Sequence, residues 1–370
     1  MGGLMDAARQ HDQDIEHDVS QGVSQGVDQG VDQGVDQGAS HDADRGVPRR
    51  PVPGLASRVR TVSARYAVIA VWAAMIAVYA AAEPGLFLRT PTFQTIFSSQ
   101  QPLVFLTMAL LCTICVGEFV DLSVPAVFSF SATLLPVLVV DHGWAVWPAA
   151  AVAVLAGVAI GAVNGLLVVV AEVNTIVVTL GMSTLLGGIS LWMSHLNSVS
   201  GLSAGFGRIA LYEVGGLPVS FYYGLVLVAG FAYLLAFSPL GRHMRFVGAS
   251  REVSRLSGVR VDRIRFGSFV AAGLLCGVGA VIAVAALGGY NPTTADSYLL
   301  PTFAAVFLGT AIIEPGTFNP VGTLIGIYFL ETGILGLQLL GLQAWVSPVF
   351  YGGVLVVAVT LSTLLRRRRR

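Results

Sequence analysis

The chain has 370 residues, of which 55% are hydrophobic and only 11% are charged. This balance is far from that of a soluble domain, so it excludes an ordinary water-soluble enzyme and indicates a membrane protein. The formal net charge is zero, yet acidic residues gather in the first fifty positions and arginines gather at a few boundaries.

Residues 1–60 are predicted to be a disordered tail. The repeats VSQG and VDQG run from Val19 to Gly38, and a repeat this short and this rich in Gly cannot bury a core. The tail has no apolar h-region, so it is predicted to be neither a cleavable signal peptide nor a folded domain. A docking role for the tail is the alternative interpretation.

Residues 61–370 are predicted to form one transmembrane domain. Arginines between positions 49 and 65 precede the first apolar run, Tyr66–Ala82, which predicts that the N-terminus is cytoplasmic. The prediction is an all-α, polytopic bundle of about ten transmembrane helices, with Phe93–Gln101 as a re-entrant or interfacial piece. The further apolar runs lie at about 102–117, 122–140, 145–171, 175–194, 218–237, 266–288, 299–313, 321–340 and 346–365.

The distribution of arginines supports this topology. An even number of spans brings the C-terminus to the cytoplasm, where the chain ends in Arg366–Arg370. The same number places the basic loop 241–265 in the cytoplasm, whereas the predicted outer loops carry only Arg89 and Arg208. Positive charge therefore gathers on one side of the predicted bundle.

Glycines recur within the apolar runs at spacings that predict close contacts between helices, because helices in lipid associate through close backbone approach. The spaced sets are Gly157, Gly161 and Gly165; Gly181, Gly187 and Gly188; Gly273 and Gly277; and Gly322 and Gly326.

Polar side chains at membrane depth are the candidate residues of a translocation path. Ionisable groups such as Asp121 are costly there and by default mark functional sites, although Asp121 or Ser123 is equally suited to cap the helix that follows. Glu118 is expected to be exposed at the cytoplasmic rim. Amides and hydroxyls in the next two runs can bind a polar solute or, more commonly, hydrogen-bond across helices. The candidate path residues are Asp121, Ser123, Asn164, Asn174, Thr175 and Thr179.

The basic loop contains one well-patterned short helix. Ser250 is a favoured N-cap, Glu252 lies in the first turn where the helix dipole favours an acid, and Gly258 suits a left-handed C-terminal residue. Val253 and Leu256 share one face. A helix of about two turns does not persist alone in water, so we expect it to dock on its own bundle or on a partner.

Motifs for bound cofactors and catalysis are missing from the sequence. It contains no nucleotide-binding loop, nucleophile elbow or zinc-protease motif, and no acid pair with catalytic spacing. We therefore expect no enzymatic activity, no cofactor and no metal in this chain. Its arginines lack the interleaved aromatic residues of a nucleic-acid surface, so no nucleic-acid partner is expected.

The order and spacing of four segments resemble those of one family, the ribose-type membrane permeases of ABC importers, which serve ribose, xylose, galactose and autoinducers. The family patterns GGIDLSVG, NGLLV, IPPFIVTLGT and RYMYAVGGNPEAARLSGI are similar, in that order, to Gly117–Pro125, Asn164–Val168, Asn174–Gly181 and Arg242–Val259. The resemblance covers about residues 90–365. The chain departs from it at Glu118, Phe119 and Pro125, in the stretch TAIIEPGTFNPVGT, and in the repeat tail.

This resemblance implies a bundle like that of type II ABC importers, in the inner membrane of a bacterium. Two permease copies, most simply a homodimer surrounded by lipid, would pair around a central path. An ABC ATPase subunit would bind the ATP, and an extracytoplasmic binding protein would deliver the monosaccharide. The short helix would be the coupling helix, and the residues implied in coupling are Gly248, Ser250, Arg251, Glu252, Val253, Arg255, Leu256 and Gly258.

Three alternatives stay open. Within the superfamily, the solute is alternatively a nucleoside or a branched-chain amino acid. A secondary transporter would need an ionisable relay or a sodium site in mid-membrane, and the chain has few such groups. A non-transporting membrane scaffold would leave the capped loop helix unexplained.

Overall fold

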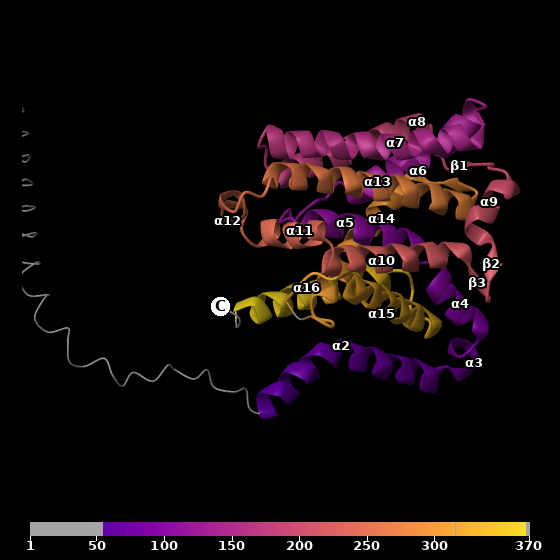
Figure 1. The fold of residues 1–370 in the computed structure, drawn as a ribbon. Helices are drawn as coiled ribbons and strands as arrows, with labels where there is room; N and C mark the ends of the chain where they lie inside the picture. The colour runs from indigo at the N-terminus through magenta and orange to yellow at the C-terminus, as the bar shows by residue number, and fades with distance from the viewer. Residues whose placement is uncertain (1–54, 315, 368–370) are drawn as a thin grey trace, which may run out of the picture. The chain divides into compact units, whose positions relative to one another are not determined.

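The computed structural model describes the backbone of residues 55–314 and 316–367, and side chains between residues 67 and 360 (Figure 1). The predicted tail thus lies almost entirely outside the described residues. In lipid a chain must satisfy its backbone polar groups internally, and long apolar segments do so as helices. The helices are α2 (Leu55–Ala82), α3 (Pro84–Phe87), α4 (Thr90–Ser98), α5 (Gln101–Ile114), α6 (Val124–Pro136), α7 (Val146–Gly165), α8 (Thr175–Met193), α9 (Ala204–Leu211), α10 (Val219–Phe237), α11 (Pro239–Ala249), α12 (Arg251–Leu256), α13 (Val261–Leu287), α14 (Ala295–Gly309), α15 (Pro320–Leu339) and α16 (Val346–Arg367), with the π-helical extensions η1 (Val137–Asp141) and η2 (Leu166–Val170) and the 3-10 turn η3 (Pro292–Thr294).

Four two-residue strands complete the described structure. Strand β1 (Val199–Ser200) pairs antiparallel with β4 (Gly289–Tyr290), with Val199 opposite Tyr290. Strand β2 (Glu213–Val214) pairs antiparallel with β3 (Leu217–Pro218). These strands and α9 lie at the end of the bundle opposite α12 (Figure 1). We call the end that carries α12 the α12 end.

The helices confirm an all-α, polytopic architecture. Two shorter apolar helices, Ala67–Ala82 and Val346–Thr360, accompany the longer ones, and the number of ten spans stays a prediction. The interpretation of Phe93–Gln101 as a re-entrant or interfacial piece stays a prediction: α4 ends at Ser98 and α5 begins at Gln101, although by length and composition the two together make one candidate span. Within the described residues, the segments long and apolar enough to cross a membrane are Thr90–Ile114, Val124–Asp141, Val146–Val170, Thr175–Met193, Val219–Phe237, Val261–Leu287 and Pro320–Leu339.

More of the basic loop is helical than the sequence predicted. Its first part is the helix α11, which begins after Ser238, whose hydroxyl accepts a hydrogen bond from the backbone N–H of Gly241 at 3.0 Å. Buried Gly241, Met244 and Val247 recur at helical spacing and attach α11 to the bundle. Helix α13 begins at Val261 rather than at 266, so Arg263 and Arg265 lie on α13 and not in a loop.

Glycines set the close packing of α7 on α13, as predicted. A Cβ atom on Gly157 would come 2.6 Å from the carbonyl oxygen of Gly273, so only the lack of a side chain permits this approach. Gly322 and Gly326 pack in the same way against α14. The glycines of α8 are different: within the described residues, nothing lies within 4 Å of a Cβ placed on Gly181, Gly187 or Gly188. The contacts predicted for α8 are therefore not made within one copy of the described chain.

Candidate functional site

The predicted short helix is present as α12. Ser250 is extended, with φ −160°, and its hydroxyl oxygen accepts a hydrogen bond from the backbone N–H of Val253 at 3.4 Å. Gly258 follows the helix with φ +78°, the left-handed conformation that the sequence predicted. The two ends of α12 are thus capped by the residues that the sequence indicated.

The faces of α12 have different environments. Ser254 is fully buried against the bundle and donates a hydrogen bond to the carbonyl oxygen of Ser250 at 2.8 Å. Leu256 is 85% exposed and Val253 is 50% exposed. Two large apolar side chains therefore project from a short, capped and charged helix, where they are available to a partner.

Gly248 attaches the start of α12 to the bundle. It lies near the end of α11, and a Cβ atom there would overlap the backbone carbonyl of Cys115 at the end of α5. The backbone of Gly117 lies within 3.5 Å of the same position. The contact that the structure gives Gly248 is therefore with its own bundle.

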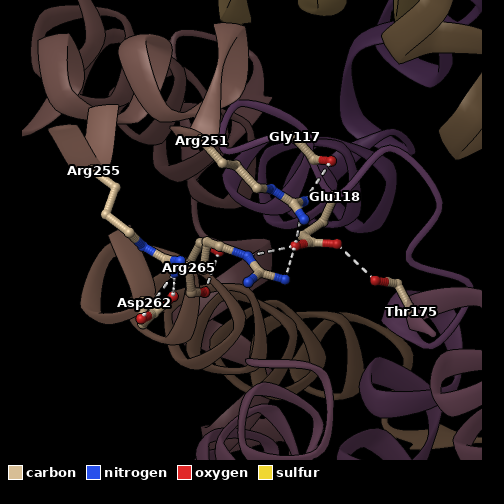
Figure 2. Close-up of polar contacts among 8 residues, drawn as sticks. Gly117, Glu118, Thr175, Arg251, Arg255, Asp262 and Arg265 are labelled. Carbon is tan, nitrogen blue, oxygen red and sulfur yellow. Dashed lines mark hydrogen bonds and ion pairs between the residues drawn. The ribbon is translucent and has the colours of Figure 1, made fainter. Parts of the chain in front are cut away.

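Glu118, in the loop between α5 and α6, binds side chains from three helices (Figure 2). Its Oε1 accepts hydrogen bonds from Arg251 Nη2 at 2.7 Å and from Arg265 Nε at 2.8 Å. Its Oε2 accepts a hydrogen bond from the hydroxyl of Thr175, at the start of α8, at 2.6 Å. Bonds between ionised groups are short and strong, so this carboxylate ties α8, α12 and α13 together.

The expectation that Glu118 is exposed at the rim is wrong, because Glu118 is only 4% exposed. A buried carboxylate is tolerated when cations and hydrogen-bond donors replace its water, and Arg251, Arg265 and Thr175 supply them. Arg251 also donates to the backbone carbonyl of Gly117 at 3.0 Å. We call Glu118, Thr175, Arg251 and Arg265 the Glu118 cluster.

A second ion pair joins α12 to the start of α13 and is exposed to solvent. Arg255 Nη2 lies 3.1 Å from the Oδ1 of Asp262 (Figure 2). The two side chains are 68% and 59% exposed. Exposed pairs of this kind stabilise little, so this pair differs in kind from the Glu118 cluster.

Asp121, Ser123 and Asn164 form a buried polar network beside this cluster. Asp121 Oδ1 accepts hydrogen bonds from the backbone N–H of Ser123 at 3.1 Å and from its hydroxyl at 2.7 Å. The same hydroxyl accepts a bond from Asn164 Nδ2 at 2.9 Å, and Asn164 Oδ1 has no partner among the described residues. Asp121 therefore binds Ser123, the N-cap residue of α6, and neither side chain accepts a capping hydrogen bond from an N–H of that helix.

The environment of Asp121 changes its acidity. The residue lies in the loop outside the candidate spans and is 1% exposed. Burial raises the pKa of Asp121 to about 6, and the hydrogen bonds from Ser123 lower it to a smaller extent. The cavity beside Asp121, Ser123 and Asn164 has a volume of about 10 Å³, which is room for about one water molecule. In this conformation the network is closed to a sugar.

The remaining candidate path residues lie at the start of α8 and bond within the bundle. The Thr179 hydroxyl donates to the backbone carbonyl of Thr175 at 2.8 Å and accepts from the backbone N–H of Leu122 at 3.2 Å. Asn174 caps α8, because its Oδ1 accepts a hydrogen bond from the backbone N–H of Ile176 at 2.9 Å. The sequence allowed two roles for these residues, binding of a polar solute or structural hydrogen bonds across helices. The contacts of Thr179 and Asn174 match the structural role.

A polar cavity of about 330 Å³ lies beside the Glu118 cluster. Both arginines of the cluster line it, and Glu172 is an acidic residue of the same lining. Its lining residues are Val168, Glu172, Val173, Asn174, Thr175, Arg251 and Arg265.

The sequence did not predict the role of Glu118 or Arg265. The sequence predicts that Arg265 belongs to the basic loop 241–265, whereas it lies on α13 and binds Glu118. One signal was present: Glu118 is an acid at the edge of an apolar run with no basic residue near it in the sequence. Such an acid needs a cation from elsewhere in the fold, although the sequence does not say which one.

Comparison with known proteins identifies the family. The model of the family described as "Branched-chain amino acid transport system / permease component" matches residues 93–359. This chain belongs to that permease family. It is 30% identical to the ribose import permease protein of Escherichia coli (strain K12) over 295 residues, which cover 78% of this chain and 90% of the relative.

Other relatives are permeases for related solutes. The D-allose transport system permease protein of Escherichia coli (strain K12) is 27% identical, over 82% of this chain and 93% of its own length. The L-arabinose ABC transporter permease protein of Azospirillum brasilense is 27% identical, over 77% of this chain and 85% of its own length. No solved structure matches the chain.

Proposed function

We propose that this chain is the membrane-spanning permease subunit of an ATP-driven importer for a monosaccharide or a similar small polyol. The observation that carries the proposal is the similarity to ribose, allose and arabinose permeases, each of which aligns over more than three quarters of this chain. The chain itself is not an enzyme in this proposal. It supplies the path, and a separate ATPase subunit binds and hydrolyses ATP.

In this proposal α12 is the coupling helix and the α12 end is cytoplasmic. The arginines of α11, α12 and the start of α13 support that orientation through the positive-inside rule, which also places both chain termini in the cytoplasm. The exposed side chains of Val253 and Leu256 are the apolar contacts for the ATPase subunit. A second copy of the chain and an extracytoplasmic binding protein complete the importer.

The buried network of Asp121, Ser123 and Asn164 marks the inner part of the path. Its amide and hydroxyl groups match the hydrogen-bonding groups of a neutral polyol. Because the adjoining cavity holds about one water molecule, the path opens here only when the helices move. That requirement fits a transporter that alternates between two conformations driven from a remote ATPase site.

Leu256→Asp tests the proposal. Aspartate removes the apolar contact and places a charge in the interface, so the ATPase subunit is expected to be lost on purification and ATP-dependent uptake to stop. The matched control is Leu196→Asp, because Leu196 is 75% exposed in the segment between α8 and α9, at the opposite end. Normal uptake by Leu256→Asp, or an equal loss of the ATPase subunit from both variants on purification, would contradict the coupling role of α12.

A branched-chain amino acid is the second candidate solute, favoured by the description of the matched family. Uptake of labelled D-ribose, D-allose, L-arabinose and L-leucine into vesicles, with and without internal ATP, separates the two candidates. ATP-dependent uptake of leucine alone would overturn the sugar assignment. Uptake that follows an ion gradient and ignores ATP would overturn the importer class.

A further inference from the structure

Glu118 joins the candidate coupling helix to the candidate path through a continuous series of hydrogen bonds. Arg251 on α12 binds Glu118 Oε1, and the Thr175 hydroxyl binds Glu118 Oε2 (Figure 2). The carbonyl of Thr175 accepts from Thr179, whose hydroxyl in turn accepts from the backbone N–H of Leu122, next to Asp121. A displacement of α12 therefore acts on both the α5–α6 loop and the start of α8.

We propose that Glu118 is the positioning residue that transmits movement of α12 to the inner part of the path. This proposal rests on the proposed function, since it takes α12 as the contact for the ATPase. A chain of packed and hydrogen-bonded groups carries coupling when one member has two arrangements. In this proposal the bond between Arg251 and Glu118, which is made in this structure, is broken in the second arrangement.

The two arginines of the cluster differ in exposure and in the helix that carries them. This difference allows the bond between Arg251 and Glu118 to break and form again. The side chain of Arg265 is 12% exposed and belongs to α13, a long helix packed closely against α7. The side chain of Arg251 is 44% exposed and belongs to α12, which has only six residues. Arg265 therefore keeps the buried carboxylate paired while Arg251 leaves with α12.

The polar cavity provides the space into which Arg251 moves. It has a volume of about 330 Å³, it is lined by Arg251 and Arg265, and Glu172 supplies an acidic group on its wall. An arginine that leaves Glu118 thus stays solvated beside a second carboxylate, which lowers the cost of breaking the bond. The bond between Arg251 and Glu118 can therefore break without leaving an unpaired charge in an apolar site.

The family resemblance does not supply this role. The ribose-type pattern GGIDLSVG has no acid before its Asp, whereas this chain has Glu118 ahead of Asp121. The proposal is therefore argued from the contacts of Glu118, the exposure of its two arginines and the cavity beside them, and not from the resemblance.

Glu118→Gln in the complete importer tests the proposal. The variant keeps the size of the side chain and its hydrogen-bonding oxygen but removes the charge that holds Arg251. The measurement is sugar imported per ATP hydrolysed in proteoliposomes containing the chain, its ATPase and its binding protein. The probe is labelled D-ribose, D-allose or L-arabinose, whichever the wild-type importer takes up fastest.

We expect Glu118→Gln to lower the number of sugars imported per ATP by about tenfold while the ATPase still copurifies and hydrolyses ATP. Asp262→Asn is the matched control, because it removes an acid that pairs with α12 in solvent, and its ratio is expected to equal that of wild type. A purely structural role for Glu118 would lower import and hydrolysis together and leave the ratio unchanged, which would overturn the proposal.

Arg251→Gln provides a second variant that leaves the pair of Glu118 with Arg265 intact and so preserves the fold. It is expected to lower the same ratio, and Glu118→Asp, which retains the charge, is expected to recover part of it. If Glu118→Gln fails to accumulate in the membrane, Arg251→Gln decides the question alone. If Arg251→Gln imports as many sugars per ATP as wild type, the proposed coupling through Glu118 is overturned.

Failure of this proposal is distinguishable from failure of the proposed function. If Leu256→Asp abolishes ATPase binding while Arg251→Gln imports as many sugars per ATP as wild type, α12 is the coupling helix. In that case only the proposed role of Glu118 is wrong. If Leu256→Asp has no effect on ATPase binding or uptake, the coupling role of α12 is wrong, and the proposed role of Glu118 is wrong as well.

Discussion

Arg251 and Arg255 lie one turn apart on α12, and each pairs with an acid, yet the two pairs differ physically. Arg251 contacts Glu118, which is 4% exposed, whereas Arg255 contacts Asp262, which is 59% exposed. Water and salt screen the exposed pair, while the buried carboxylate depends on its arginines for the interactions that water would otherwise provide. Helix α12 is therefore anchored to the bundle at its start and exposed to solvent at its end.

The largest expected effect in this comparison follows from Glu118→Ala. Removing the carboxylate leaves Arg265 buried without its acid, which is expected to cost about 3 kcal/mol of stability. Thermal unfolding of the purified chain in detergent measures the change. Asp262→Ala is the control, and its effect is expected to stay below about 1 kcal/mol because the pair is exposed. Equal effects of the two substitutions would mean that burial does not distinguish the two pairs.

Asp121 extends the comparison to a buried acid that accepts hydrogen bonds from Ser123 and forms no ion pair with an arginine of the described residues. Its pKa is raised to about 6 from an ordinary value of 3.8. The folded state therefore holds this proton more tightly than the unfolded state does. Protonation of Asp121 therefore contributes to the free energy of unfolding. This contribution is on the order of 2–3 kcal/mol, is present in full below about pH 4 and is lost as the pH rises through 6.

Asp121→Asn removes this pH dependence while its side-chain oxygen can still accept hydrogen bonds from Ser123. We expect the unfolding temperature of the variant, relative to wild type, to rise between pH 4.5 and pH 7 and to stay level above pH 7. Unfolding scans of both proteins across that range measure the difference. A constant difference from pH 4.5 to pH 8 would contradict the raised pKa.

The sequence predicted the parts of the site that depend on neighbouring residues. Helix α12 formed between Ser250 and Gly258 because an N-cap and a left-handed glycine act within a few residues of themselves. Helix α11 had an equally local signal, Ser238 followed by Pro239, which is typical of a helix start. That helix could therefore have been predicted too.

The sequence did not predict the parts that depend on long-range packing. Glu118 meets arginines that lie 133 and 147 positions away in the chain, and no local pattern specifies such pairs. The glycines show the same limit, because the sequence predicted helix contacts for the sets on α7 and α8 alike, while only those on α7 contact another helix of the described chain. Spacing predicts which residues share a face, but the fold decides what covers that face.

Gly248→Ala tests the anchored start of α12 from the backbone side. The new Cβ would overlap the carbonyl of Cys115, so α11 must shift away from the end of α5, at a cost of about 1–3 kcal/mol. Because the shift carries Arg251 away from Glu118, sugar imported per ATP is expected to fall as well. Gly267→Ala is the control, since nothing lies within 4 Å of a Cβ at that position on α13. If Gly248→Ala unfolds at the wild-type temperature and imports normally, α12 does not depend on this contact, and the anchoring of its start would rest on Arg251 alone.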